Sequence, residues 1–155
     1  MSNIVTLREV TQYDLPVFFE HQQDPEAAKM AAFPSRDKGA FMAHWAKIMK
    51  DDKVIRKTIL FDGQVAGNIV NFEMFGKWEV GYWIGKEFWG RGIASEALKQ
   101  LLSEVKTRPL YAHVAKQNIA SQRVLQKCRF EIIGEDKWQP NSNGEEVEEL
   151  ILELK

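Results

Sequence analysis

The sequence predicts a single α/β domain in which a mixed β-sheet of about seven strands carries helices on both faces. The length of 155 residues suits one compact domain. Stretches in which apolar and polar residues alternate are interrupted by stretches with helical spacing. One strand also leads through a glycine-rich loop into a long helix, and a crossover of that kind makes the next strand parallel. We therefore expect one domain over residues 1–155.

A strand and a helix are predicted to open the chain. Apolar and polar residues alternate from Ile4 to Arg8, which is typical of a half-buried strand. Either Thr11 or Asp14 is expected to cap the helix that follows. Asp14 is the better N-cap, because it places Pro16 in the first turn, where a missing N–H costs nothing.

A second helix is predicted before residue 54. Ser35 or Asp37 is expected to begin it, since the apolar residues from Phe41 to Met49 follow helical spacing. The segment 30–36 is expected to be a loop between the two helices.

From residue 54 onward, period-two alternation and β-branched residues predict three strands, at 54–61, 64–72 and 78–84. Asp62-Gly63 joins the first two, and this dipeptide is typical of a tight hairpin. The remaining elements are expected to be a helix, a strand, a helix and two strands, at 92–106, 110–114, 118–128, 130–133 and 146–154, with a turn at 141–144. Crossovers around the two helices are expected to make the central pairing parallel.

Composition limits the possible partners. With 21 Lys plus Arg against 22 Asp plus Glu, the net charge is -1, which gives no bulk attraction to nucleic acid or to an anionic membrane. No apolar stretch reaches the roughly 18 residues of a membrane span. The single cysteine, Cys128, excludes a disulfide framework, and His21, His44 and His113 are too far apart for metal-ligand spacing. We expect a cytoplasmic protein without a metal.

The loop between the third strand and the long helix has the composition of an anion site. The start of a helix carries unpaired N–H groups and a partial positive charge, so small residues there let the backbone approach a phosphate. Gly90, Gly92 and Ala94 meet this requirement, and Arg91 adds a charged donor. The alternative is that the two glycines serve only a sharp turn.

Two nucleotide motifs do not fit this loop. The run from Gly85 to Gly92 comes close to a P-loop, but Arg91 replaces the lysine and Gly92 replaces the magnesium-binding Ser or Thr. A dinucleotide fingerprint also fails, because the run 90–95 (GRGIAS) has no third Gly or Ala at its end.

The segment from Glu79 to Leu98 instead resembles the acetyl-CoA motif of the GNAT N-acetyltransferases, and most closely the ribosomal-protein N-terminal acetyltransferase (RimJ/RimL-like) branch. The segment from Asn118 to Phe130 is similar to the second motif of that branch. The order of elements matches along the whole chain, so the resemblance implies a GNAT-like sheet. Trp89 stands where the superfamily has Gln or Arg, although an aromatic residue is usual in this branch.

The resemblance implies acetyl-CoA as co-substrate. Its pyrophosphate would be held by the backbone N–H groups of residues 90–95, and its pantetheine arm would pair like an extra strand with the sheet edge. Asn118 would bond the pantetheine side, or else serve only as an N-cap. The residues implied at the coenzyme are Trp83, Ile84, Trp89, Gly90, Arg91, Gly92, Ile93, Ala94, Ser95 and Asn118.

The chemistry needs a base for the amine and help for the departing thiol. The position of Glu79 resembles that of a glutamate that serves as the base in the family, so Glu79 is expected to accept the amine proton through a water. The alternative is that Glu79 is a strand carboxylate paired with a Lys or Arg. Glu73 is a weaker candidate for the base. Ser121 matches a serine proposed to assist the thiol, or else caps locally. Leu125 occupies the position at which many family members have a tyrosine that serves as the general acid. Arg129 replaces the glycine that the family usually has before Phe130.

We therefore predict an acetyl-CoA-dependent N-acetyltransferase that transfers the acetyl group directly to a primary amine, either a peptide N-terminus or a small molecule. The alternatives are a CoA-binding module of the same fold with little turnover, and a nucleotide-binding domain based on the near P-loop. His113 is expected to be structural, and Cys128 to lie in the core. The protein is expected to be a monomer or a homodimer.

Overall fold

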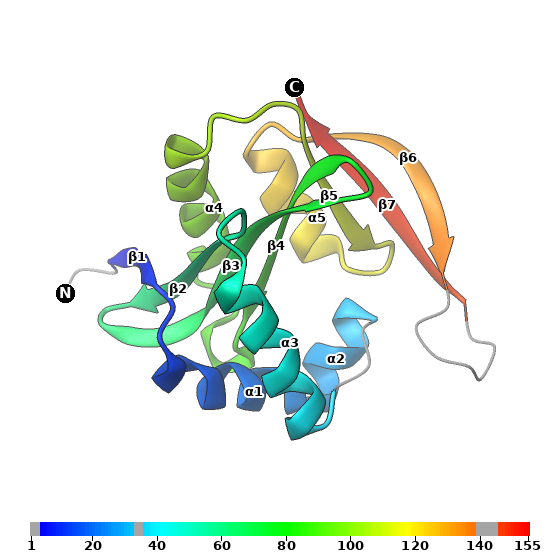
Figure 1. Ribbon diagram of the computed structural model, residues 1–155. Coiled ribbons are helices and arrows are strands. Elements are labelled where there is room, and N and C mark those ends of the chain that lie inside the picture. Colours follow the sequence, from blue (N-terminus) through cyan, green and yellow to red (C-terminus); the bar gives the residue numbers. More distant parts are fainter. Residues whose placement is uncertain (1–3, 33–35, 139–145) are drawn as a thin grey trace.

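The computed structural model describes residues 4–32, 36–138 and 146–155. A seven-stranded mixed sheet in the order β1-β2-β3-β4-β5-β7-β6 forms its centre. Helices cover both faces, with α1 to α3 on one and α4 and α5 on the other (Figure 1). The elements in chain order are β1 (Val5–Glu9), η1 (Gln12–Asp14), α1 (Leu15–Gln23), α2 (Pro25–Ala31), α3 (Lys38–Lys50), β2 (Ile55–Phe61), β3 (Gln64–Met74), β4 (Lys77–Ile84), η2 (Lys86–Phe88), α4 (Ile93–Glu104), β5 (Leu110–Ala115), α5 (Ile119–Lys127), β6 (Glu131–Trp138) and β7 (Val147–Leu154).

The helices before β2 number one more than predicted. Asp37 begins α3 as expected, because its side chain accepts a hydrogen bond from the Ala40 N–H at 2.8 Å. The additional helix is α2, which starts at Pro25 behind the N-cap Asp24. It includes the first two residues of the predicted loop 30–36, and Ser35 lies outside the described residues. A helix of only two turns has too few residues to display a clear period.

Asp14 occupies the N-cap position of α1, with Pro16 in the first turn as the sequence suggested, but its side chain makes no capping hydrogen bond to that helix. Its carboxylate is buried and accepts two hydrogen bonds from the guanidinium of Arg8, at 2.7 and 2.8 Å. It also accepts hydrogen bonds from the Thr11 N–H at 2.9 Å and the Thr58 hydroxyl at 2.7 Å. Asp14 therefore joins the first helical turn to β1 and β2.

The β2–β3 hairpin turns at Asp62-Gly63, as predicted. Both residues have positive φ, 50° and 84°, which is the backbone of the tight turns that match strand twist. This hairpin and β4 form the antiparallel half of the sheet.

The two predicted crossovers have different outcomes. The crossover through α4 places β5 parallel to β4, as expected. The crossover through α5 does not place β6 beside β5, because β7 returns from its hairpin with β6 and pairs antiparallel with β5. The predicted turn at 141–144 lies outside the described residues.

Two apolar clusters lie against opposite faces of the sheet. The larger cluster includes the buried side chains of Leu98 and Leu101 from α4 and Leu125 from α5. The smaller cluster contains Phe18 of α1 and Trp45 of α3, whose ring centroids are 5.2 Å apart. Cys128 packs against the larger cluster, as expected. The even-numbered residues of β4 from Trp78 to Ile84 belong to the larger cluster, so the odd-numbered ones, including Glu79, face the other side of the sheet.

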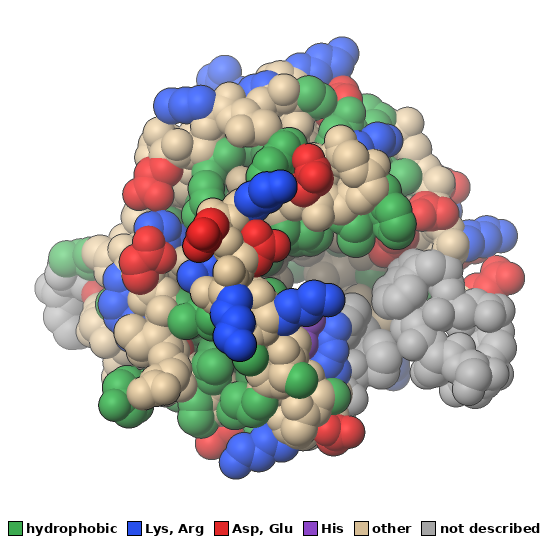
Figure 2. Space-filling view, viewed as in Figure 1, with side chains coloured by type: hydrophobic (Ala, Val, Ile, Leu, Met, Phe, Trp, Pro, Cys, Tyr) green, Lys and Arg blue, Asp and Glu red, His purple; other side chains and the backbone are tan. Residues whose placement is uncertain are grey.

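The surface carries charges of both signs. Lys and Arg are interspersed with Asp and Glu over the face shown in Figure 2. Among the helices of the described residues, none has the length and apolarity needed to cross a membrane.

Candidate functional site

A cavity of about 330 Å³ opens beside the C-terminal end of β4. Its walls come from β4, the loop into α4, the start of α5, and α2. The residues along it are Ala27, Met30, Ala31, Tyr82, Trp83, Ile84, Phe88, Trp89, Gly90, Gly92, Ile93, Ala94, Ser95, Asn118, Ala120, Ser121 and Val124. Nine of the ten residues predicted at a coenzyme line this cavity; Arg91 does not.

The cavity exists because β4 and β5 separate. Their ladder has one registered pair, Glu79 opposite Tyr111, and beyond it no pairing joins the two strands. The cavity is lined by β4 residues 82–84 on one side and by the chain following β5, from Asn118 onward, on the other. The separated strands leave the edge of β4 unpaired over these residues, so an extended ligand has backbone groups to bond.

The two loop glycines adopt a backbone that other residues rarely adopt. Gly90 has φ 77° and Gly92 has φ 73°, and no heavy atom lies within 4 Å of where a Cβ would be at either position. The first hydrogen bond of α4 is donated by the Glu96 N–H to the Gly92 carbonyl, so the N–H groups of residues 93–95 precede the helical pattern. The loop therefore combines open space with N–H donors at the start of a helix.

The two flanking residues Trp89 and Arg91 point in different directions. The Trp89 indole donates to the Ile84 carbonyl at 2.9 Å and lines the cavity. The guanidinium carbon of Arg91 lies 5.6 Å from the centre of the Phe61 ring, outside the lining. The contribution of Arg91 to an anion site thus remains a prediction, whereas the backbone of the loop is positioned for one.

The open edge of β4 consists of alternate residues. The Gly85 N–H donates to the Ala66 carbonyl at 2.9 Å, within the β3–β4 pairing. Because backbone groups alternate sides along a strand, the N–H and C=O of Trp83 also face β3, whereas those of Tyr82 and Ile84 face β5. Trp83 lines the cavity, but its backbone is not the free edge. The groups available to an extended ligand are those of Tyr82 and the Ile84 N–H.

Glu79 is almost fully buried, 4% exposed, and its partner is a histidine. The Glu79 Oε1 atom lies 2.7 Å from Nδ1 of His113 on the adjacent strand β5. This hydrogen bond raises the pKa of His113, against the opposing effect of burial, and nearby Glu149 and Asp136 add to it. Glu79 therefore pairs with a histidine and not with a Lys or Arg, which was the alternative. The two residues lie beside the point where the strands separate.

Asn118 and Ser121 are both in the cavity lining, at the start of α5. The Asn118 Oδ1 atom accepts a hydrogen bond from the Ser121 N–H at 3.2 Å, so the predicted N-cap exists. The Ser121 Oγ atom lies 2.6 Å from the hydroxyl of Tyr82 on β4. Sequence reasoning missed Tyr82, since 39 residues separate the pair and no local pattern joins them.

Helix α2 closes the cavity from the side, and sequence reasoning missed it as well. Two contacts hold it across the separated strands: Glu26 pairs with Lys86 of η2, and the Gln117 side chain donates to the Lys29 carbonyl at 2.6 Å. Its Asp24-Pro25 start is a recognisable signal, because Asp is a good N-cap and Pro suits the first helical position.

Three potential metal ligands come close together near His113. A nitrogen of His113 and carboxylate oxygens of Asp136 and Glu149 lie within 4.8 Å of one another. Asp136 is exposed and His113 is already bonded to Glu79. We interpret the two carboxylates as the electrostatic surroundings of the histidine. The absence of a metal remains a prediction.

Comparison with known families identifies the family of this chain. Residues 5–131 match the acetyltransferase (GNAT) domain family. A relative from Bacillus licheniformis, described as an uncharacterised N-acetyltransferase p20, is 24% identical over 164 residues, covering 97% of this chain and 92% of the relative.

Solved structures share the fold. A spermidine N-acetyltransferase from Vibrio cholerae, in complex with CoA and spermine, superposes with a TM-score of 0.82 at 17% identity over 97% of this chain and 94% of that one. A ribosomal-protein-alanine N-acetyltransferase from Brucella melitensis superposes with a TM-score of 0.79 at 22% identity over 96% and 98%. At these identities the likeness concerns the fold alone.

Proposed function

The chain belongs to the acetyltransferase (GNAT) domain family and is an N-acetyltransferase, and from that premise we propose that it transfers the acetyl group of acetyl-CoA directly to a primary amine. The family and the mixed α/β fold were both predicted from the sequence, and both are confirmed. The identity of the amine, the residue roles and the mechanism below are proposals.

One observation carries the proposal: the cavity runs from the α4 loop to the place where β4 and β5 separate. The N–H groups of residues 90–95 suit a pyrophosphate at one end. The free backbone of Tyr82 and Ile84 suits an amide-rich arm along the strand. Glu79 and His113 do not themselves line the cavity. In this proposal the thioester at the end of the arm lies on the side of the cavity toward that pair and reaches it through a water. Apolar walls supplied by α2 limit access of water.

The Glu79–His113 pair takes the proton of the amine in this proposal. The amine nitrogen forms a bond to the thioester carbon, the carbon–sulfur bond breaks, and the electron pair leaves with sulfur. The amine gives its proton to the pair, directly or through a water. A neutral α-amine is already present in part near pH 7.7 to 8.0, roughly its ordinary pKa, so a modest base is sufficient.

The acceptor remains either a peptide N-terminus or a small amine. The resemblance to the ribosomal-protein branch and the Brucella structure favour the first, and the Vibrio structure is of an enzyme for the second. Both kinds of acceptor therefore belong in one assay. Extract incubated with isotope-labelled acetyl-CoA and analysed by mass spectrometry would reveal either an acetylated protein or an acetylated metabolite.

The direct test is thiol release by the purified protein with acetyl-CoA and a panel of peptides and small amines. We expect amine-dependent release, and a rise in melting temperature on adding CoA but not ATP with magnesium. Stabilisation by CoA without turnover of any amine would instead favour the CoA-binding module. Stabilisation by ATP with magnesium alone would favour the nucleotide-binding alternative.

A further inference from the structure

We propose that Tyr82 is a positioning residue for the departing thiol: its hydroxyl donates to Ser121 Oγ and thereby directs the Ser121 proton at the sulfur that leaves the acetyl group. This inference rests on the proposed function and adds a residue to it. It also accounts for how a chain with Leu125 in place of the usual tyrosine can assist the thiol.

The two hydroxyls meet inside the cavity. Tyr82 extends from β4 and Ser121 from the first turn of α5, and their oxygen atoms are 2.6 Å apart. The Ser121 carbonyl oxygen, 3.3 Å away, is a second acceptor for the Tyr82 hydroxyl, but Ser121 Oγ is the nearer one. The Ser121 N–H is held by Asn118 Oδ1, which fixes the serine against the strand. These contacts place the hydroxyl pair between β4 and the start of α5, where both residues line the cavity.

The direction of the short hydrogen bond follows from acidity. A phenol is a stronger acid than an aliphatic alcohol and is the better donor of the two. Burial raises the pKa of Tyr82 to about 12, although the hydrogen bond with Ser121 opposes this, so the phenol keeps its proton at neutral pH. A hydroxyl has one proton and two acceptor sites. When Ser121 Oγ accepts from Tyr82, its own proton remains for a ligand in the cavity.

The hydroxyl pair and the Glu79–His113 pair lie on opposite faces of β4. Successive side chains of a strand alternate, so Tyr82 faces the cluster beneath α4 and α5, and Glu79 faces the other way, toward His113. The two residues are three positions apart, about 10 Å along the strand. A thioester beside Ser121 therefore has a hydroxyl donor for sulfur in the cavity itself, and the Glu79–His113 pair on the other face takes the amine proton through water.

The step balances without a proton from Ser121. As the carbon–nitrogen bond forms, the carbon–sulfur bond breaks and sulfur takes the electron pair. The amine proton goes to the Glu79–His113 pair, and the negative sulfur accepts a hydrogen bond from Ser121. An alkyl thiol has a pKa of about 8.5, so the thiolate takes its proton from solvent afterwards.

The experiment compares Tyr82→Phe, Ser121→Ala and the double variant with the native protein. We expect Tyr82→Phe to lower kcat with acetyl-CoA about 10-fold, with KM within about twofold, and Ser121→Ala to lower kcat about 10- to 100-fold. The double variant should be no slower than Ser121→Ala, because Tyr82 acts through the serine. With an aryl thioester such as S-acetylthiophenol, whose thiolate needs less stabilisation, the loss for Tyr82→Phe should shrink to about twofold or less.

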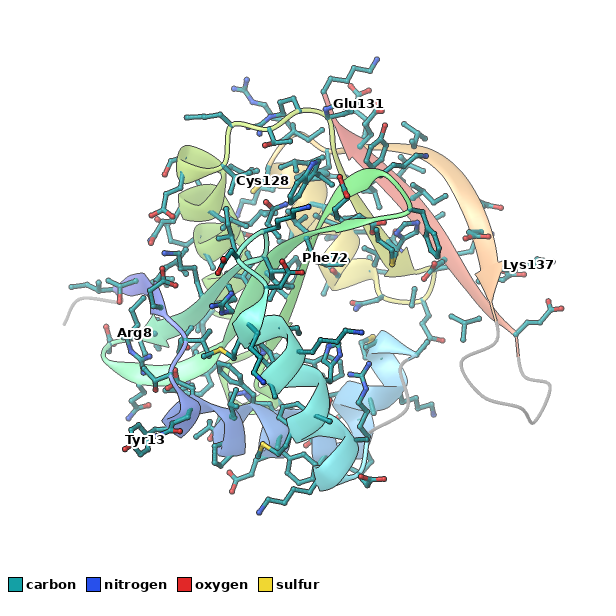
Figure 3. All side chains as sticks on the ribbon, in the orientation of Figure 1. Arg8, Tyr13, Phe72, Cys128, Glu131 and Lys137 are labelled. Carbon is teal, nitrogen blue, oxygen red and sulfur yellow. The ribbon has the colours of Figure 1, made fainter. Side chains whose placement is uncertain are left out.

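A second readout does not need an acceptor amine. The thiol of bound CoA, titrated by the ultraviolet absorbance of its thiolate, should have a lower pKa on the native protein than in solution, and Tyr82→Phe should raise it toward the solution value. Tyr13→Phe is the matched control, because that side chain is 80% exposed and points away from the fold (Figure 3).

The outcomes separate this inference from the proposed function. A changed titration in Tyr82→Phe together with no turnover of any amine supports the hydroxyl pair and contradicts the proposed transfer. Turnover in which Tyr82→Phe matches the native protein in kcat and in the titration overturns the hydroxyl pair alone. Equal losses with alkyl and aryl thioesters also overturn it. A protein that does not bind CoA overturns both.

Discussion

The Nδ1 atom of His113 on β5 lies 2.7 Å from Oε1 of Glu79 on β4, and Glu79 also belongs to the one registered pair of these two parallel strands. Glu79 is buried and the His113 side chain is 26% exposed, so the pair connects the interior of the sheet to solvent. A carboxylate bonded to one ring nitrogen stabilises the imidazolium, and this is why the pKa of His113 is raised. In the proposed mechanism, the pair that accepts the amine proton is the neutral imidazole with the carboxylate.

The first prediction concerns the pH dependence of kcat. Because the pair must be deprotonated to act, and the pKa of His113 is raised, kcat at saturating amine should rise with pH along a limb centred above pH 6.5. Glu79→Gln should lower kcat about 100- to 1,000-fold. His113→Gln keeps a hydrogen-bonding side chain but removes the titrating group, so the limb centred above pH 6.5 should disappear. Discontinuous assays of thiol release from pH 5 to 9 measure the loss of kcat and the change in its pH profile.

Glu73→Gln is the matched control for that experiment. Glu73 is a carboxylate on the neighbouring strand β3, but it is exposed, whereas Glu79 is buried and bonded to His113. Its removal should leave kcat and the pH profile unchanged. If Glu79→Gln retained kcat within twofold of the native protein, the base would have to be another group.

The second prediction separates two roles of the loop glycines. Gly92→Ala should lower stability by about 1 kcal/mol, because its φ is 73°, and should also weaken CoA binding at least 10-fold by placing a methyl group where the phosphate approaches. Gly76→Ala has the same backbone conformation, φ 79°, and equally open surroundings, but lies in the β3–β4 turn. It should lose similar stability and keep its affinity for CoA. Calorimetric titration and thermal unfolding measure the two quantities.

Equal CoA affinity in Gly92→Ala and Gly76→Ala would mean that Gly92 serves the turn only. That alternative was open from the sequence, and the positive φ values fit both interpretations. The comparison decides between them because the two variants carry the same strain.

The parts of this protein that could be predicted from the sequence depend on neighbouring residues. The Asp62-Gly63 turn and the glycine loop are specified within a few positions of the chain, and the structure has both. The long helix α4 could be predicted for the same reason, since its apolar stripe spans three turns.

The parts that escaped prediction depend on contacts between distant segments. The Glu79–His113 and Tyr82–Ser121 pairs span 34 and 39 residues, and the register that brings each pair together is set by the whole sheet. The position of β7 between β5 and β6 also depends on distant contacts, because either β6 or β7 could pair with the free edge of β5. Alternation along a strand places Glu79 and Tyr82 on opposite faces, but it does not identify their partners.

The third prediction concerns acid unfolding. Burial alone would raise the pKa of Asp14, but hydrogen bonds from Arg8, the Thr11 N–H and Thr58 outweigh it and lower the pKa to about 2. The folded pKa is therefore below the unfolded value of 3.8, so the stabilisation is present above pH 3.8 and is lost as the pH falls toward 2. Its size is about 2 kcal/mol.

Asp14→Asn should lower the free energy of unfolding at pH 7 by at least that amount and flatten its dependence on pH between 4 and 2. Asp52→Asn, at an exposed position after α3, should change stability by less than about 0.5 kcal/mol. Urea unfolding at a series of pH values measures both. Below pH 4, the stability of the native protein should fall more steeply than that of Asp14→Asn. Equal slopes would contradict this assignment.

The fourth prediction follows from the end of α5. Arg129 has φ 73°, a left-handed conformation that costs a non-glycine residue about 1 kcal/mol. The Arg129 N–H bonds the Gln126 carbonyl and the Phe130 N–H bonds the Leu125 carbonyl, both at 3.0 Å, which is the hydrogen-bond pattern of a Schellman motif. This geometry explains why the family usually has glycine at this position. Arg129 adopts the left-handed backbone of this motif although it is not a glycine.

Arg129→Gly should therefore raise stability by about 0.5 to 1 kcal/mol and the melting temperature by roughly 1 to 4 °C for a domain of this size. Arg129→Ala removes the same side chain and keeps the strained backbone, so its melting temperature should stay near that of the native protein. Neither variant should change kcat, because Arg129 is exposed and outside the cavity lining. A lower melting temperature in both variants would mean that the arginine side chain makes a stabilising contact larger than the backbone cost.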